Sequence, residues 1–142
     1  MQKNTLIFIV IILVASFLRL LWLDKIPHSI NGDQIHYILS AKSFFITAKD
    51  VTQTTSLPSI FLFHYPPGEL VQAELPYLLE FLTIGILPFS LLAVFFPNAL
   101  LGISLVFLIY LITKKLINEE IALASSFIAA VSPWFIFIGR TS

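Results

Sequence analysis

The apolar residues of this chain fall into long runs that carry few or no charges. The first run covers residues 5–23, and Arg19 is its only charged residue. A helix of that length crosses the hydrocarbon core of a bilayer, which is about 30 Å thick. The pattern therefore predicts a transmembrane helix, with Arg19 snorkelling to the interface at its far end and Trp22 in the aromatic belt.

A cleaved signal peptide is the alternative interpretation of this first run. Lys3 would form its basic start, and Val14-Ala15-Ser16 would form the cleavage site. Because the apolar run continues beyond that triplet to Leu23, we favour an uncleaved membrane anchor.

A second span is predicted where a charge-free stretch is interrupted by proline. Residues 81–113 carry no charge, but a single helix of that length would be about 50 Å long, too long for one crossing. Pro88 and Pro97 interrupt the stretch. We therefore place the span from about Leu91 or Pro97 to Leu116, so that it ends at the Lys114-Lys115 pair.

A third span is predicted at residues 121–138, after the turn Asn118-Glu119-Glu120. Pro133 lies near the end of this run and predicts a kink, because proline lacks the N–H that continues a helix. Trp134 beside it is typical of an interface anchor.

The polar stretch from 24 to 90 predicts a large loop with two short helices at the membrane surface. The first covers Asp33–Thr47, with Ile35, Ile38, Leu39 and Ile46 near one face and Asp33 as its N-cap. The second lies in the first half of Glu69–Phe96. We expect Glu69, Glu74 and Glu80 to keep that helix wet at the interface.

The fold class that follows is all-α and membrane-embedded, with three spans and two interfacial helices in one membrane domain covering 1–142. The excess of Lys and Arg in cytoplasmic loops places Lys3 and the Lys114-Lys115 pair inside. One outward and one return crossing satisfy both. The N-terminus is then cytoplasmic, the loop 24–90 is extracytoplasmic, and Arg140 returns to the outer side.

Composition excludes several other classes of protein. The chain is 58% apolar and only 11% charged, whereas a soluble domain carries about 25% charged residues. This argues against a disordered chain and against a water-soluble enzyme. The net charge is zero, so nucleic-acid binding has no electrostatic support. There are no cysteines, and the three histidines lack the close spacing of a zinc motif, so we expect no cofactor or metal.

Polar residues that could carry chemistry gather in two clusters of the predicted outer loop. The first is Asn31-Gly32-Asp33-Gln34-Ile35-His36-Tyr37, and the second is His64-Tyr65-Pro66-Pro67-Gly68. Arg19 and Arg140 are predicted near the same membrane surface. The simplest interpretation gives Asp33 a capping role alone and makes the Pro-Pro pair a rigid turn.

These motifs resemble, in order, the start of the polyprenyl-phosphate-sugar-dependent glycosyltransferases of the GT-C superfamily. That family includes the protein O-mannosyltransferases and the lipid A aminoarabinose transferases. The resemblance begins with Arg19–Leu23 and the Asn31–Tyr37 cluster and continues with Tyr65-Pro66-Pro67-Gly68. It extends through Phe96–Leu116 and Ile121–Arg140.

The resemblance implies transfer of a sugar from a polyprenyl-phosphate donor to a hydroxyl acceptor outside the cytoplasm. It places the catalytic base on Asp33, since a hydroxyl needs a carboxylate to take its proton. It places substrate binding on a set of loop and membrane-end residues: Gln34, His36, Tyr37, His64, Tyr65, Glu69 and Arg140. The chain departs from the family where Gln34 replaces a Glu, His36 replaces an Arg and Tyr65 replaces a Lys.

Two further hypotheses stay open at this stage. The chain would be the N-terminal part of a longer enzyme, because family members have more spans. Alternatively, it is a small non-catalytic membrane subunit that pairs with other proteins through the small residues Gly102, Ser104, Ala122, Ala124, Ser125 and Ser126. A transporter fragment is disfavoured, since the predicted span interiors lack ionisable residues.

Overall fold

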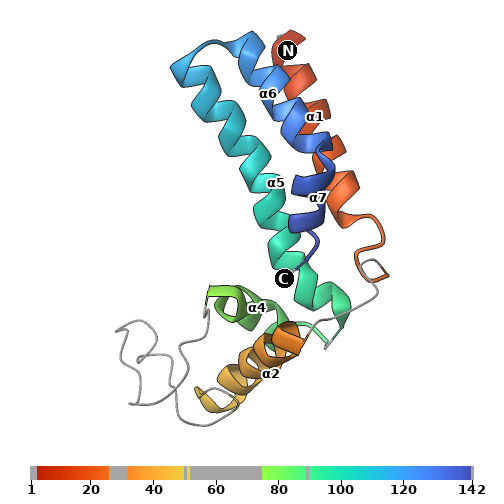
Figure 1. The fold of residues 1–142 in the computed structure, drawn as a ribbon, viewed down its shortest axis with the longest axis vertical. Helices are drawn as coiled ribbons and strands as arrows, with labels where there is room; N and C mark the ends of the chain where they lie inside the picture. The colour runs from red at the N-terminus through yellow and green to blue at the C-terminus, as the bar shows by residue number, and fades with distance from the viewer. Residues whose placement is uncertain (1–2, 26–31, 50, 52–74, 89, 142) are drawn as a thin grey trace. The chain divides into compact units, whose positions relative to one another are not determined.

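The computed structural model describes residues 3–25, 32–49, 51, 75–88 and 90–141, and all its helices are α-helices. They are α1 (Lys3–Leu20), α2 (Gly32–Thr47), α4 (Leu75–Ile86), α5 (Leu91–Leu116), α6 (Glu119–Val131) and α7 (Pro133–Ile138) (Figure 1). The chain divides into two compact units. The first, the bundle unit, holds residues 1–26 and 98–142. The second, the loop unit, holds residues 27–97.

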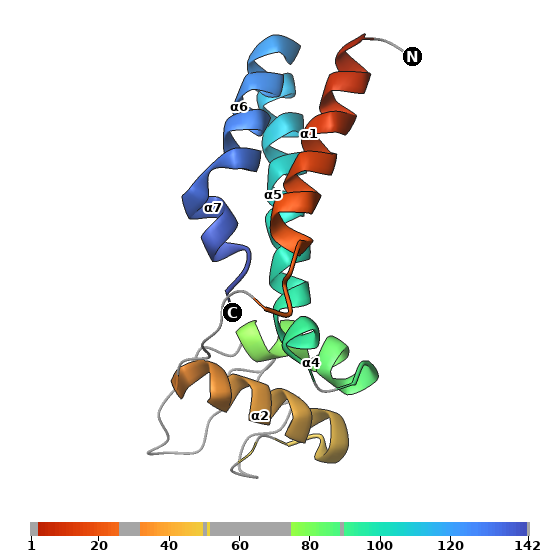
Figure 2. The same cartoon turned by 90° about the vertical axis from the view of Figure 1, so that its right-hand side faces the viewer.

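In the bundle unit α1, α6 and the main part of α5 lie side by side, as Figures 1 and 2 both show. Their shared core contains Ile11 and Ala15 from α1, Val106 from α5, and Ala129 and Ala130 from α6. Three of these five core residues are alanines. Such small side chains let two helix backbones approach closely.

Aromatic and polar contacts join the start of α1 to the turn between α5 and α6. The rings of Phe8 and Tyr110 stack with centroids 3.8 Å apart and planes at 20°. Asn118 caps α6, because its side chain accepts a hydrogen bond of 2.9 Å from the N–H of Ile121. The start of α1 therefore lies beside the end of α5 that carries Lys114.

The loop unit is built on the packing of α2 against α4. Ile38, Ala41 and Phe44 of α2 are buried, as is Ile84 of α4. The rings of Phe45 and Phe81 contact each other across the two helices, with centroids 5.7 Å apart. A Cβ on Gly85 would collide with the Phe45 ring, so glycine lets α2 approach this closely.

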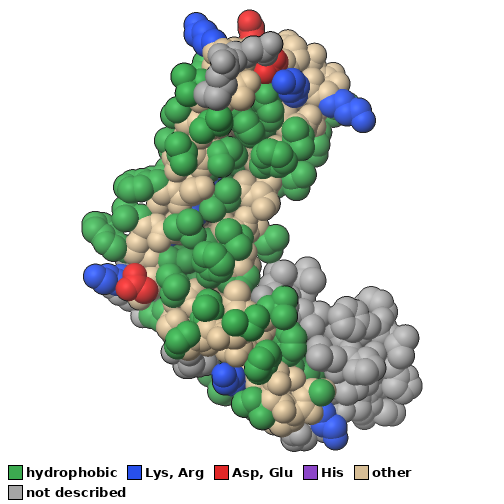
Figure 3. Space-filling model, turned by 180° about the vertical axis from the view of Figure 1, so that it is seen from behind, with side chains coloured by type: hydrophobic (Ala, Val, Ile, Leu, Met, Phe, Trp, Pro, Cys, Tyr) green, Lys and Arg blue, Asp and Glu red, His purple; other side chains and the backbone are tan. Residues whose placement is uncertain are grey.

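Two described helices are long and apolar enough to cross a membrane, Lys3–Leu20 and Leu91–Leu116. They match the first two predicted spans, and α5 has the predicted bounds. Their outer faces expose large apolar side chains, among them Leu13 at 63% and Phe17 at 61%. Figure 3 shows apolar side chains over the bundle unit and charged ones at the end where α5 meets α6.

The third predicted span, 121–138, is not a single helix. It is divided into α6 and α7 at Ser132, whose backbone is extended with φ −60° and ψ 121°. Pro133 begins α7 and cannot donate the hydrogen bond that would continue α6. The predicted kink at Pro133 is thus a complete break.

Candidate functional site

Asp33 lies in the first turn of α2, which begins at Gly32. The helix starts one residue earlier than predicted, so Asp33 stands inside the first turn and not at the N-cap. A carboxylate in this turn is favoured by the positive end of the helix dipole. The spacing of Asp33, His36 and Tyr37 places these three positions on one face of the helix.

The same face of α2 is the one that packs in the loop unit. By helical periodicity, positions 33 and 37 align with Ser40, Ala41 and Phe44, whose side chains are buried. The proposed base position therefore shares a face with the α2–α4 contact. By the same periodicity, position 36 shares that face and position 34 lies at its edge. The side chains of positions 33, 34, 36 and 37 lie outside the described residues.

Glu80 of α4 is buried in the loop unit, with 0% of its side chain exposed. The prediction that it keeps an interfacial helix wet is wrong. Glu80 lies in α4, the helix that packs against α2. The loop unit therefore holds a buried carboxylate that the sequence pattern did not reveal.

A lysine connects α2 to the end of α4. The ammonium of Lys42 donates a hydrogen bond of 3.3 Å to the carbonyl oxygen of Ile84, in the last turn of α4. A cation is favoured there because the carbonyl end of a helix is negative.

Arg140 lies at the far end of the bundle unit, beside the end of α1. Its Nη1 donates to the carbonyl oxygen of Leu18 at 2.9 Å, and its Nη2 donates to that of Trp22 at 3.2 Å. Trp22 lies in the turn two residues after the end of α1, and its backbone is in the left-handed region, with φ 53°. A bulky residue adopts this conformation at a cost of about 1–3 kcal/mol. Arg140 thus stabilises a strained helix end.

Arg19 is fully buried in the bundle unit, with 0% exposed, so the prediction that it snorkels to the interface is wrong. Its Nη1 donates to the carbonyl oxygen of Ala130 at 3.0 Å and of Ala15 at 3.3 Å, and its Nη2 donates to that of Ala129 at 3.2 Å. The sequence held one signal for this arrangement. Pro133 lies four residues after Ala129 and leaves that carbonyl without its helical donor.

A cavity of about 300 Å³ lies between α5 and α7 in the bundle unit. Two glycines face it, Gly102 and Gly139, and both also adjoin the side chain of Arg19. The remaining lining is mainly apolar. The full lining set is Asn98, Leu101, Gly102, Leu105, Phe135, Ile138 and Gly139.

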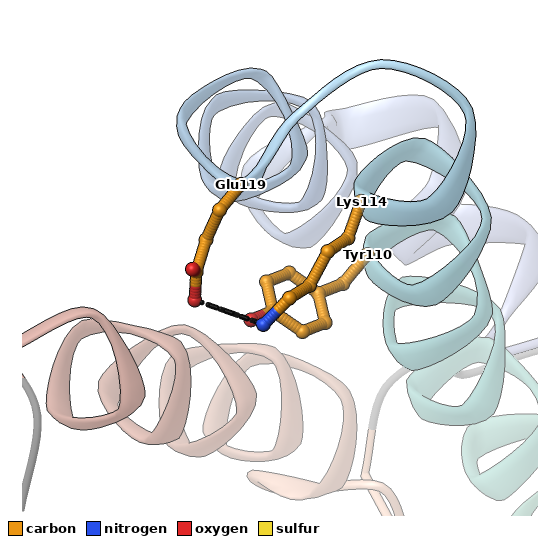
Figure 4. Close-up of polar contacts among 3 residues, drawn as sticks. All are labelled: Tyr110, Lys114 and Glu119. Atoms are coloured by element: carbon orange, nitrogen blue, oxygen red, sulfur yellow. Dashed lines mark hydrogen bonds and ion pairs between the residues drawn. The ribbon is translucent and has the colours of Figure 1, made fainter.

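A polar cluster occupies the opposite end of the bundle unit (Figure 4). Lys114 donates to a Glu119 carboxylate oxygen at 3.0 Å and to the Tyr110 hydroxyl at 3.2 Å, and that hydroxyl donates to the same oxygen at 3.1 Å. Hydrogen bonding from Lys114, and secondarily from Tyr110, lowers the pKa of the Glu119 carboxyl. These contacts fasten the α5–α6 turn.

Three predicted substrate-binding residues, His64, Tyr65 and Glu69, lie outside the described residues. The structure therefore describes the backbone of the first polar cluster from Gly32 onward and the side chain of Arg140. It does not describe the second cluster.

Comparison with known proteins gives one positive result. Residues 74–142 match the model of the dolichyl-phosphate-mannose-protein mannosyltransferase family. No curated protein and no solved structure matches the chain. The matched segment covers α4, α5, α6 and α7, and with them Glu80, Gly102 and Arg140. The family resemblance is therefore confirmed over residues 74–142, and this segment belongs to a family of GT-C membrane glycosyltransferases, the dolichyl-phosphate-mannose-protein mannosyltransferases.

Proposed function

We propose that this chain transfers a sugar from a polyprenyl-phosphate donor to a hydroxyl acceptor on the extracytoplasmic side of a membrane. The observation that carries the proposal is the family match over residues 74–142. Two apolar helices of membrane-spanning length support it, because the donor is a membrane lipid. The α2 backbone supports it further, since Asp33, His36 and Tyr37 share one helix face.

Asp33 acts as the general base in this proposal. As the acceptor oxygen attacks the anomeric carbon, its proton passes to the Asp33 carboxylate. The new carbon–oxygen bond forms while the bond to the polyprenyl phosphate breaks and its electrons leave with the phosphate. Attack opposite the leaving group inverts the anomeric centre. General-base assistance of this kind contributes about 10²–10⁴-fold to a rate.

The remaining proposed residues bind the substrates. Positive charge is needed near the departing phosphate, and Arg140 and protonated His36 would supply it. Gln34 and Tyr37 would hydrogen-bond sugar or acceptor. His64, Tyr65 and Glu69 would complete the donor site from the second cluster.

The test is sugar transfer from a panel of polyprenyl-phosphate sugars in membranes that contain the protein, beside the variant Asp33→Asn. We expect transfer by the parent and a loss of about 100-fold or more in Asp33→Asn. Asp24→Asn is the matched control, because Asp24 is an exposed aspartate of the same predicted loop. It should keep parental activity.

The other outcomes are informative in different ways. Equal activity in Asp33→Asn and the parent would remove the role of Asp33 and leave the transferase proposal standing. No transfer with any donor would contradict the proposal and favour the non-catalytic subunit, which co-purification would then examine. Two small residues suggested for partner contacts, Ala122 and Ser126, are already buried within this chain, which weighs against that alternative.

A further inference from the structure

The break between α6 and α7 leaves backbone carbonyls that need donors. The last carbonyls of an α-helix have no partner within the helix. Here the N–H of Ser132 donates a hydrogen bond of 2.9 Å to the carbonyl oxygen of Ile128. Pro133 has no N–H, so it cannot donate to the carbonyl oxygen of Ala129. In a membrane interior an unsatisfied carbonyl costs several kcal/mol.

Arg19 supplies those donors from another helix. Its two terminal nitrogens reach the carbonyls of Ala129 and Ala130 at 3.2 and 3.0 Å. The planar guanidinium suits this task, since it presents parallel N–H groups to neighbouring oxygens. The negative end of the α6 dipole also favours the charge. The buried cation is thus balanced by a helix end, through hydrogen bonds to backbone carbonyls.

Arg19 also contacts the segment that leads into Arg140. A Cβ on Gly139 would lie 3.4 Å from Nε of Arg19, so Gly139 packs directly on the guanidinium. The next residue, Arg140, donates back to the carbonyls of Leu18 and Trp22 at the end of α1. The two arginines therefore act in opposite directions. Arg19 of α1 donates hydrogen bonds to carbonyls at the end of α6, and Arg140, which follows α7, donates to carbonyls at the end of α1.

We propose that Arg19 is a positioning residue that fixes the α6–α7 break and thereby holds Arg140 at the end of α1. The part of this inference that concerns α6 and α7 stands on the contacts alone. The consequence for catalysis, that Arg19 orients a cation for the donor phosphate, rests on the proposed function.

The decisive experiment is a double-mutant cycle between Arg19→Met and Pro133→Ala in the full chain, in detergent or nanodiscs. Alanine at 133 restores an N–H that can serve the carbonyl of Ala129. Arg19→Met should lower Tm by about 5 °C or more. Adding Pro133→Ala should recover a large part of that loss. Recovery of Tm would point specifically to the missing hydrogen bonds, because a new backbone N–H at residue 133 would not repair a general loss of packing at Arg19.

Hydrogen exchange locates the effect. In Arg19→Met the amides of residues 133–141 should exchange about tenfold faster or more, while those of α5 near Tyr110 keep their rates. Lys115→Met is the matched control, since it removes an exposed cation from the other end of the bundle unit. It should change neither Tm nor exchange, with or without Pro133→Ala.

Several results would overturn the inference. Additive effects of the two substitutions would mean that Arg19 does not serve the break, and unchanged exchange at 133–141 would mean that it does not fix α7. If Arg19→Met cannot be purified in a folded state, the same cycle is run with Arg19→Lys, and the yield of folded protein is compared with and without Pro133→Ala. A yield that Pro133→Ala does not raise would contradict the inference. Failure of Arg140 variants to alter donor use would instead contradict the proposed function and leave the positioning role intact.

Discussion

A Cβ atom on Gly102 would lie 2.9 Å from Nε of Arg19 and 3.3 Å from Cα of Gly139. The guanidinium of Arg19 therefore rests on the backbone of α5 where that helix carries no side chain. The glycine at this position is required by the close approach of two elements.

Gly102→Ala tests this contact by two opposing effects. Alanine should gain about 1 kcal/mol of helix propensity inside α5. The clash should cost about 1–3 kcal/mol, because three carbonyls hold Arg19 and the Gly139 backbone limits any movement. We expect net destabilisation in thermal unfolding. Ser104→Ala on the same helix, at an exposed position, should be neutral within about 0.5 kcal/mol. A stabilised Gly102→Ala would show that this approach is not tight.

Glu119 predicts a pH dependence of stability. Hydrogen bonding from Lys114 lowers its pKa in the folded chain below the ordinary value of 4.5. The carboxylate therefore stabilises the fold above that ordinary value, and its contribution is lost as the pH falls through the lowered pKa. A plot of Tm against pH should lose part of its acid limb in Glu119→Gln. Glu120→Gln, at the exposed neighbouring position, should keep the parental curve. Identical curves for Glu119→Gln and the parent would contradict the role given to this carboxylate.

Lys42→Met should loosen α4 from α2. The substitution removes the hydrogen bond to the carbonyl of Ile84 and a favourable charge at the end of α4, worth about 1 kcal/mol together. The amides of Ile86 and Leu87 should then exchange several times faster. Lys49→Met, which removes an exposed lysine that follows α2, is the control. Equal exchange in the two variants would mean that the Lys42 contact does not hold the helix end.

Membrane topology can be tested with single cysteines, because the chain contains none. A membrane-impermeant maleimide added outside intact cells should label Asp24→Cys and leave Lys115→Cys unlabelled. Opening the cells should expose the second. Leu13→Cys, whose position is exposed in the bundle unit but predicted to face lipid, should resist labelling from both sides. Labelling of Lys115→Cys from outside would reverse the predicted orientation.

The hydrophobic pattern predicted the individual helices well. The α5 bounds, the end of α2 at Thr47 and the break at Pro133 all follow from runs of apolar residues, charges and proline. These features depend on residues close together in the sequence. Asp33 was predicted as the N-cap of α2 and lies one position further in, within the first turn.

Two of the wrong predictions concern how helices pack against one another. Arg19 was assigned to the interface because a lone arginine in an apolar run usually snorkels. Its real partners are carbonyls about 110 residues later, in a helix end that exists only after Pro133 breaks the span. Glu80 was assigned to water because of its charge, whereas it is fully buried in the folded chain. Pairings of this kind have no local signature.

The alanine contact between α1 and α6 reverses the usual rule for tolerated substitutions. In water a larger apolar residue at an interface gains from leaving the solvent. In lipid that gain disappears, because the hydrocarbon is as apolar as the contact itself. The stability of the contact then depends on how closely the two helices pack. Ala15 and Ala129 therefore favour serine or glycine over leucine as replacements. Variation at these positions should follow side-chain volume and not hydrophobicity, so that an apparently conservative aliphatic change is the damaging one.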